Sequence, residues 1–198
     1  MIPFIDDDFI EAQTSFKDLG DLLSREFNNP EVTTPLRHHH DFPNPGSEKD
    51  STLLLMPAWR AGKDLGVKIV TVSPDNGKYD LPSIQGNYLY MDAHKGSVRA
   101  IFDAKALTAK RTAAVSALAA TFLARRDSDT LLVLGTGALA RNLVLAHAEF
   151  SRLKQVYIWG RDFEKANKLV RSLIQSLDQN LGADLKLQSF AIEAVPDF

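Results

Sequence analysis

The sequence contains no cysteine, which excludes disulfide bonds, thiolate metal sites and a cysteine nucleophile. It also lacks an apolar run long enough for a membrane-spanning helix, and its start, MIPFIDDDFIEA, has acids where a signal peptide needs basic residues. A strong excess of charge is missing too, since 23 basic residues oppose 25 acidic ones. We therefore expect a cytoplasmic protein with no nucleic-acid or membrane partner.

The chain has an ordinary globular composition. Its 198 residues are 44% hydrophobic and 24% charged, which is enough for one good core or two small ones. We find no internal repeat and no low-complexity tract.

The first half of the sequence predicts a helix followed by a mainly antiparallel sheet. Apolar residues recur at helical spacing over 6–28, and turn formers and charges predict an exposed loop over 41–52. Strands are predicted for LLLMPAW, for VKIVTVS and for two segments that flank a turn at 94–96. The favoured hairpin dipeptide Asn76-Gly77 lies in the connection before the last two strands.

The pattern changes after residue 104. An alanine-rich helix over 106–126 is followed by alternating strands and helices that end in the segment LKLQSF. This alternation predicts the start of a parallel, doubly wound sheet. We expect an α/β protein with a mainly antiparallel α+β domain at 1–110 and a Rossmann-type domain at 111–198. Such sheets usually have about six strands, so the second domain is expected to be incomplete here.

The segment LGTGALA places Gly135, Gly137 and Ala140 at the spacing G-x-G-x-x-A between a strand and a helix. The first glycine allows a tight turn, the second lets the backbone approach a pyrophosphate, and a small third residue lets the helix pack on the strand. Two glycines after a strand often mark only a turn. The strand–turn–helix–strand context favours a dinucleotide site.

The next strand ends in WGRD, which contains Arg161 and Asp162. An acid about twenty residues past the glycines suits the ribose hydroxyls of NAD, whereas an arginine suits the 2′-phosphate of NADP. We slightly favour NADP because the arginine comes first. The alternatives are NAD bound through Asp162 and a pair of solvated loop charges.

Two cationic features need an explanation. Lys110 and Arg111 lie in what we expect to be the first turn of the helix over 106–126, where the helix dipole favours anions. Either they point into water or an anion shares the site, and we favour the anion. Lys68 stands in an otherwise apolar strand. It is either a buried lysine that needs a counter-charge or an exposed one that needs none.

The run HHH at 38–40 raises the question of a metal site. In an extended segment only His38 and His40 share a face, and zinc usually needs three or four ligands. We therefore expect a polar loop and no metal. By residue type alone, Met56 and Trp59 are expected to pack in the core.

Several segments occur together and in this order in the ornithine cyclodeaminase/mu-crystallin family, which the chain resembles from about residue 35 to its end. The segments are MPAW, VKIVTV, ALTAKRTAAVSALAATFLAR, LLVLGTGALARNL and VYIWGRDFEKA. TAKRTAAVSA is the most specific, since many families share the glycine loop. LLLMPAW resembles the members that reduce small cyclic imino acids such as 1-pyrroline-2-carboxylate.

The resemblance implies an NAD(P)H-dependent homodimer whose N-terminal sheets join at the subunit interface, with the substrate between the two domains. It assigns Arg37, Met56, Lys68 and Arg111 to a carboxylate-bearing amino or imino acid, with Lys68 also the catalytic residue. The cofactor contacts that it implies are Ser83, Arg111, Thr112, Gly135, Gly137, Ala138, Leu139, Arg161 and Asp162. Lys110 has no such match and is expected to face solvent.

The resemblance also implies a catalytic aspartate in a later Rossmann strand, and no residue of this chain matches it. We therefore expect a chain that is truncated after VPDF, and whether it is an enzyme stays open. The leading interpretation is reduction of a cyclic imino acid to a proline-like amino acid. The alternatives are conversion of ornithine to proline and ammonia, binding of NADPH or another ligand without turnover, and an inactive fragment.

Overall fold

The computed structural model describes residues 1–177 and 186–190, which form two units. The first unit is Met1–Thr14 with Arg25–Thr108, and the second is Ser15–Ser24 with Ala109–Phe198. The second unit thus consists of two separate stretches of the sequence, so no single boundary in the chain divides the two units. In the part of the chain that the structure describes, every helix is too short or too polar to cross a membrane.

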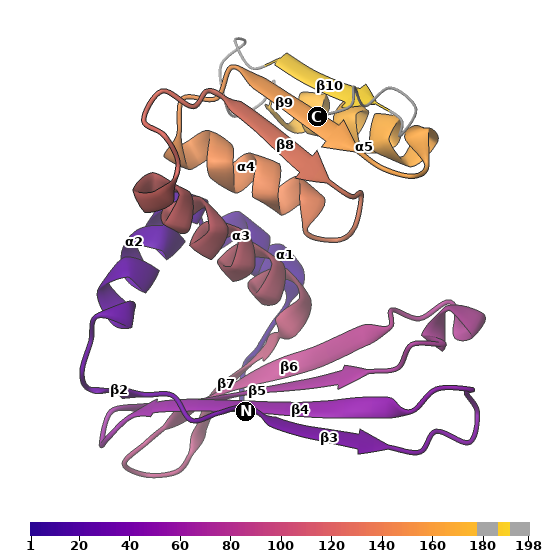
Figure 1. The fold of residues 1–198 in the computed structure, drawn as a ribbon. Helices are drawn as coiled ribbons and strands as arrows, with labels where there is room; N and C mark the ends of the chain where they lie inside the picture. Colours follow the sequence, from indigo (N-terminus) through magenta and orange to yellow (C-terminus); the bar gives the residue numbers. More distant parts are fainter. Residues whose placement is uncertain (178–185, 191–198) are drawn as a thin grey trace. The chain divides into compact units, whose positions relative to one another are not determined.

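The first unit is built on a seven-stranded sheet in the order β1-β7-β6-β5-β4-β2, with β3 also paired to β4 (Figure 1). Its strands are β1 (Phe4–Ile5), β2 (Val32–Thr33), β3 (His38–Phe42), β4 (Ser51–Arg60), β5 (Asp64–Val72), β6 (Ile84–Asp92) and β7 (Val98–Asp103). β1 runs parallel to β7, and the other neighbouring pairs are antiparallel. The mainly antiparallel sheet expected from the sequence is confirmed.

The turns between the long strands differ in kind. Gly62 between β4 and β5 and Gly96 between β6 and β7 both have a φ of 69°, which glycine adopts without strain. The β5–β6 connection instead contains a 3-10 helix at Asn76–Tyr79. The Asn76 side chain donates to the Pro82 carbonyl at 2.9 Å, so this asparagine stabilises a longer loop and not a two-residue hairpin turn.

The helix expected over 6–28 is two helices, α1 (Asp7–Gln13) and α2 (Phe16–Phe27). Thr14 is extended, with a φ of −125° and a ψ of 120°, and this ends α1. Ser15 then caps α2, because its Oγ accepts the Asp18 N–H at 3.0 Å and donates to the Asp18 carboxylate at 2.7 Å. Apolar spacing alone could not reveal this interruption.

The three histidines expected in a loop lie in β3, an exposed edge strand. Asp41 helps to fix this strand, because its carboxylate accepts a hydrogen bond from Thr52 of β4 at 2.6 Å and lies 3.0 Å from His39 Nε2. Pairing with β4 therefore makes this segment a strand, although its polar composition favoured a loop. Among the described residues, no group of three or more His, Cys, Asp or Glu could hold a metal ion.

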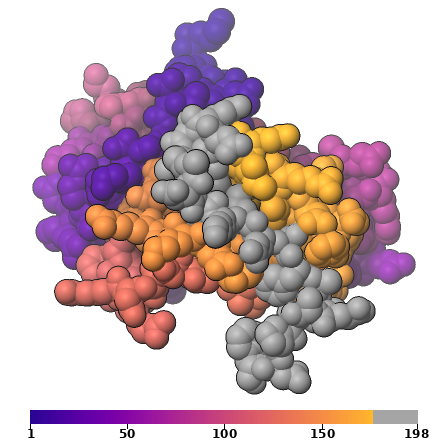
Figure 2. Space-filling view, turned by 90° about the horizontal axis from the view of Figure 1, so that it is seen from above, coloured from indigo at the N-terminus to yellow at the C-terminus, as the bar shows by residue number. Residues whose placement is uncertain are grey.

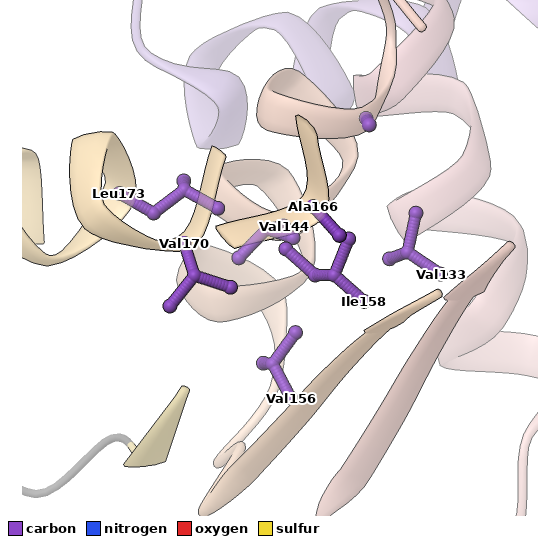
Figure 3. Close-up of a cluster of buried hydrophobic side chains, with 8 residues drawn as sticks. Val133, Val144, Val156, Ile158, Ala166, Val170 and Leu173 are labelled. Carbon is purple, nitrogen blue, oxygen red and sulfur yellow. The ribbon is translucent and has the colours of Figure 1, made fainter. Parts of the chain in front are cut away.

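The second unit has the β-α-β-α-β order expected of a Rossmann-type domain. Its elements are β8 (Thr130–Leu134), α4 (Ala140–Phe150), β9 (Gln155–Trp159), α5 (Phe163–Leu177) and β10 (Lys186–Phe190). The strands are parallel, in the order β10-β9-β8. Figure 3 shows Val133, Val156 and Ile158 of the strands meeting Val144, Ala166, Val170 and Leu173 of α4 and α5 in one core. The predicted α/β class is confirmed.

Helix α3 spans Ala104–Leu123 and begins earlier than the sequence predicted. Two carboxylates hold its first turn, because Asp7 accepts the Ala106 N–H at 2.7 Å and Asp103 accepts the Lys105 N–H at 3.0 Å. The helix dipole acts most strongly on the first turn, and Lys110 and Arg111 lie beyond that turn. Our prediction that they stand at the positive end of the helix is wrong.

Lys110 is also not solvent-facing, since only 4% of it is exposed. Its ammonium lies 5.2 Å from the ring centroid of Phe16 on α2, a cation–π contact. Phe16 packs in the same cluster as Ala113, Ala117 and Ala146, whose small side chains let α2, α3 and α4 approach one another. Which face of α3 is covered by α2 depends on tertiary packing, so the prediction from sequence that Lys110 faces solvent is wrong.

Candidate functional site

The glycine loop joins β8 to α4. Gly135 has a φ of 115°, a conformation that strains any other residue, and its N–H donates to the Trp159 carbonyl at 2.7 Å. A Cβ added at Gly137 would meet no protein atom within 4 Å. Gly135 is therefore required by its backbone conformation, and open space lies outside the loop at both Gly135 and Gly137, as expected where a backbone approaches a pyrophosphate.

The start of α4 is open to an anion. Leu139 occupies the N-cap position and makes no side-chain cap hydrogen bond. The first N–H groups of a helix lack acceptors within the helix and carry the positive end of its dipole. Ala138 and Leu139 are exposed, so a phosphate can reach this helix start.

The loop after β9 lies next to the glycine loop, because the parallel strands β8 and β9 end side by side at Leu134 and Trp159. Asp162 caps α5, since its Oδ1 accepts the Lys165 N–H at 3.1 Å and its Oδ2 lies 3.7 Å from Lys165 Nζ. Arg161 is exposed, and Figure 2 shows the orange β9–α5 segment at the molecular surface. The glycine loop and the loop after β9, which contain the residues predicted to bind the pyrophosphate and the adenosine end of a dinucleotide, therefore lie next to each other.

In the first unit, Lys68 stands at the centre of a row of side chains. It pairs in register with Met56 on β4 and with Tyr88 on β6, so all three project from one face of the sheet. Arg37 directly precedes β3, and the register of β3 on β4 brings its backbone beside Met56. Lys68, Met56 and Tyr88 are half-buried, and Arg37 is exposed. The sheet therefore gathers three of the four residues predicted to bind substrate.

A paired charge network occupies the same face toward the beginning of β5. Arg60 forms an ion pair with Asp64, which also accepts the Tyr90 hydroxyl at 2.7 Å, and Arg99 donates to Asp92 at 2.6 Å. The Tyr90 hydrogen bond, followed by that of Arg60, lowers the pKa of Asp64. Arg99, followed by the Lys95 N–H, holds the pKa of Asp92 far below its usual range. These charges satisfy one another, so the network is structural.

The remaining predicted contacts belong to other elements of the two units. Ser83 is exposed just before β6, and its Oγ donates to the Pro74 carbonyl at 3.4 Å. Arg111 and Thr112 belong to α3 in the second unit; Arg111 is exposed and Thr112 is half-buried. Their contacts with substrate and cofactor stay predictions. Sequence reasoning missed Tyr88, because only the strand register reveals that it lies next to Lys68.

A parallel β-α-β-α-β unit with a glycine loop and an open helix start defines a protein with a Rossmann-type, dinucleotide-binding fold. The sequence model of the ornithine cyclodeaminase/mu-crystallin family matches residues 7–191, and the chain belongs to this family. The resemblance stated from the sequence is thereby confirmed.

Two relatives show how similar the chain is to other proteins in sequence. The chain is 41% identical over 194 residues to an uncharacterized protein of Schizosaccharomyces pombe, covering 95% of this chain and 56% of that protein. It is 35% identical over 162 residues to the Delta(1)-pyrroline-2-carboxylate reductase of Colwellia psychrerythraea, covering 81% of this chain and 51% of the relative.

Among solved structures, the fold matches the Thermococcus litoralis Delta(1)-pyrroline-2-carboxylate reductase in complex with NADH and L-proline. The TM-score is 0.83 at 24% identity, covering 96% of this chain and 57% of that one. The chain thus spans about half the length of the relatives that it matches.

Proposed function

We propose that this chain is part of an NAD(P)H-dependent oxidoreductase that reduces a small cyclic imino acid, such as 1-pyrroline-2-carboxylate, to a proline-like amino acid. The observation that carries the proposal is the glycine loop, in which Gly135 has a φ that only glycine adopts without strain and both Gly135 and Gly137 face open space. The similarity to the Colwellia reductase supports the choice of reaction.

The residues of the second unit fit a dinucleotide. Gly135, Gly137, Ala138 and Leu139 would hold the pyrophosphate at the start of α4, which no side chain caps. Ser83, Arg111 and Thr112 are the further contacts that we propose. When bound, the reduced nicotinamide would supply the two-electron reductant for the imine carbon.

We propose NADP over NAD on the strength of Asp162. One oxygen of this carboxylate is committed to the cap of α5, and the other lies near Lys165 Nζ. A carboxylate that reads the ribose of NAD accepts hydrogen bonds from the sugar, and in Asp162 the helix cap and Lys165 compete for the same oxygens. Arg161 is exposed beside it and has the geometry of choice for a 2′-phosphate.

The substrate carboxylate would bind at the row centred on Lys68. An arginine fixes the plane of a carboxylate with two parallel hydrogen bonds, and a lysine adds a compact charge. We propose Arg37 and Arg111 for the first role and Lys68 for the second. Lys68 would also deliver the proton that the reduced imine nitrogen needs.

The test is a pair of assays on the purified protein. Consumption of NADPH with 1-pyrroline-2-carboxylate supports the reductase. Conversion of ornithine to proline with catalytic NAD would replace it with the cyclodeaminase. NADPH binding without turnover of either substrate would leave a ligand-binding protein, and no binding of NADPH or NADH would refute the cofactor site.

We further propose a homodimer formed through the sheet of the first unit. The face opposite Lys68 carries Leu55, Val67, Ile69 and Leu89, all half-buried in the single chain. Such a row of apolar side chains is stabilised by a second apolar surface.

Ile69→Asp is expected to convert a dimer into a monomer in light scattering coupled to size exclusion, because a carboxylate would be buried at the interface. The matched control is Ile84→Asp, which changes an exposed apolar residue on the opposite face of the same sheet. A monomeric wild-type protein, or a dimeric Ile69→Asp variant, would contradict this interface.

A further inference from the structure

The row of side chains across β4, β5 and β6 surrounds Lys68 with two different neighbours. Lys68 has Met56 on one side and Tyr88 on the other, in direct register. Side chains opposite each other in adjacent strands have Cβ atoms about 5 Å apart. Met56 and Tyr88 are therefore the cross-strand neighbours of any group that Lys68 binds.

Tyr88 is held in place from two directions. Its ring meets Phe102 of β7 edge-on, with the centroids 6.1 Å apart and an interplanar angle of 67°. Its hydroxyl end lies over Gly66, where an added Cβ would clash with the Tyr88 Oη and ring. The absence of a side chain at Gly66 thus makes room for a rigid aromatic group beside Lys68.

The neighbouring tyrosine shows what is unusual about Tyr88. Tyr90 lies on the same face of β6, and its hydroxyl donates to Asp64 at 2.7 Å. In the described residues, the Tyr88 hydroxyl has no such acceptor, and burial raises the pKa of this phenol. Tyr90 is therefore part of the charge network, whereas Tyr88 is a neutral residue in register with Lys68 whose hydroxyl lies over Gly66.

We propose that Tyr88 determines substrate specificity: its fixed ring forms a wall beside the Lys68-bound carboxylate and restricts the substrate to a compact five-membered ring. This inference rests on the proposed function of the Lys68 site. Met56, on the other side of Lys68, is flexible and adapts to shape, so the rigid wall sets the limit on size. The Tyr88 hydroxyl supplies an additional hydrogen bond to the carboxylate.

The experiment measures binding of two unreactive probes to the full chain by calorimetry in the presence of NADPH. Pyrrole-2-carboxylate has a five-membered ring, and pyridine-2-carboxylate has a six-membered one. The wild type is expected to prefer the smaller probe. Tyr88→Leu should reduce this preference about tenfold, the scale on which one ring atom is discriminated in an apolar site.

Two variants separate the ring from the hydroxyl. Tyr88→Phe keeps the wall and should keep the preference for the smaller ring, while it binds both probes more weakly. Tyr90→Phe, the matched control, should leave the preference unchanged because its hydroxyl serves Asp64. A cooperative thermal transition for each variant shows that it is folded, and Tyr88→Phe tests the hydroxyl even if Tyr88→Leu does not fold.

The outcomes distinguish the specificity inference from the function on which it rests. If wild type binds neither probe, or if Lys68→Met binds both unchanged, the carboxylate site is wrong and the role of Tyr88 fails with it. If wild type binds at Lys68 but Tyr88→Leu keeps the full preference, the site stands and Tyr88 is not its size limit.

Discussion

At the scale of single residues, the same chemical group has different uses in different surroundings. Asp162 and Arg161 are neighbours in the sequence, yet Asp162 is engaged in capping α5 while Arg161 is exposed. Lys110 and Arg111 are neighbours too, and Lys110 is buried against Phe16 while Arg111 is exposed. Of the two cations on α3, only Arg111 is exposed to a ligand, and of the two charges after β9, only Arg161 has no structural hydrogen bond to the start of α5.

Arg161→Ala is expected to weaken NADPH binding by about tenfold or more and to change NADH binding little, because a charge-assisted pair with the 2′-phosphate is lost. Calorimetric titration with both cofactors measures this difference. Asp162→Asn serves as the control, since it alters the cap and should affect both cofactors alike. Equal losses for the two cofactors in Arg161→Ala would argue against 2′-phosphate recognition.

Arg111→Ala is expected to weaken carboxylate binding by about 2 to 4 kcal/mol if the arginine pairs with a buried substrate carboxylate. The dissociation constant of pyrrole-2-carboxylate in the presence of NADPH is the measurement. Lys105→Ala removes another exposed cation of α3 and should leave that constant unchanged. An unaltered constant for Arg111→Ala would remove this residue from the site.

At the scale of elements, the β8–α4 junction contains one glycine that the fold requires and another that we expect only a ligand to require. Gly135 has a positive φ and donates a hydrogen bond to Trp159 at the end of β9, whereas Gly137 has no positive φ; an added Cβ would meet open space at both. The same junction leaves the start of α4 without a side-chain cap. Each of these features can be altered separately.

The two glycines therefore predict opposite phenotypes. Gly135→Ala should destabilise the protein by roughly 1–3 kcal/mol, because alanine is strained at this φ. Gly137→Ala should leave the free energy of unfolding unchanged and weaken NADPH binding about tenfold, because its methyl group occupies the space of the pyrophosphate. Urea unfolding and calorimetry test the pair; a stable Gly135→Ala, or full NADPH affinity in Gly137→Ala, would contradict this division.

At the scale of the whole molecule, the charge network at one end of the first sheet predicts how stability depends on pH. Asp64 and Asp92 have folded-state pKa values below the ordinary value of an aspartate, about 3.9. A carboxyl group with a lowered folded pKa contributes stability above its unfolded pKa and loses it as the pH falls toward the folded value.

The free energy of unfolding is therefore expected to decrease as the pH is lowered below about 4. Urea unfolding between about pH 7 and pH 3 measures this slope, and Asp92→Asn should flatten it because one linked carboxyl group is gone. Asp8→Asn, an exposed change on α1, is the control. A slope that Asp92→Asn leaves as steep as in wild type would show that the network does not control acid stability.

The sequence alone determined the α/β class, the antiparallel first sheet, the β-α-β-α-β order of the second unit and the family. These properties depend on periodicity and turn chemistry within short windows, and the TAKRTAAVSA and LGTGALA motifs carry the family. The glycine loop was also predictable, because its residues are adjacent in the chain.

Only the tertiary structure decided which side chains meet across the chain. The histidines of 38–40, which we expected in a loop, lie in β3, and Lys110 is buried against Phe16. The segment Ser15–Ser24 belongs to the second unit. The tertiary structure also set Tyr88 beside Lys68. The physical reason is that strand register and the covered face of a helix are set by partners far away in the sequence, so no local pattern contains them.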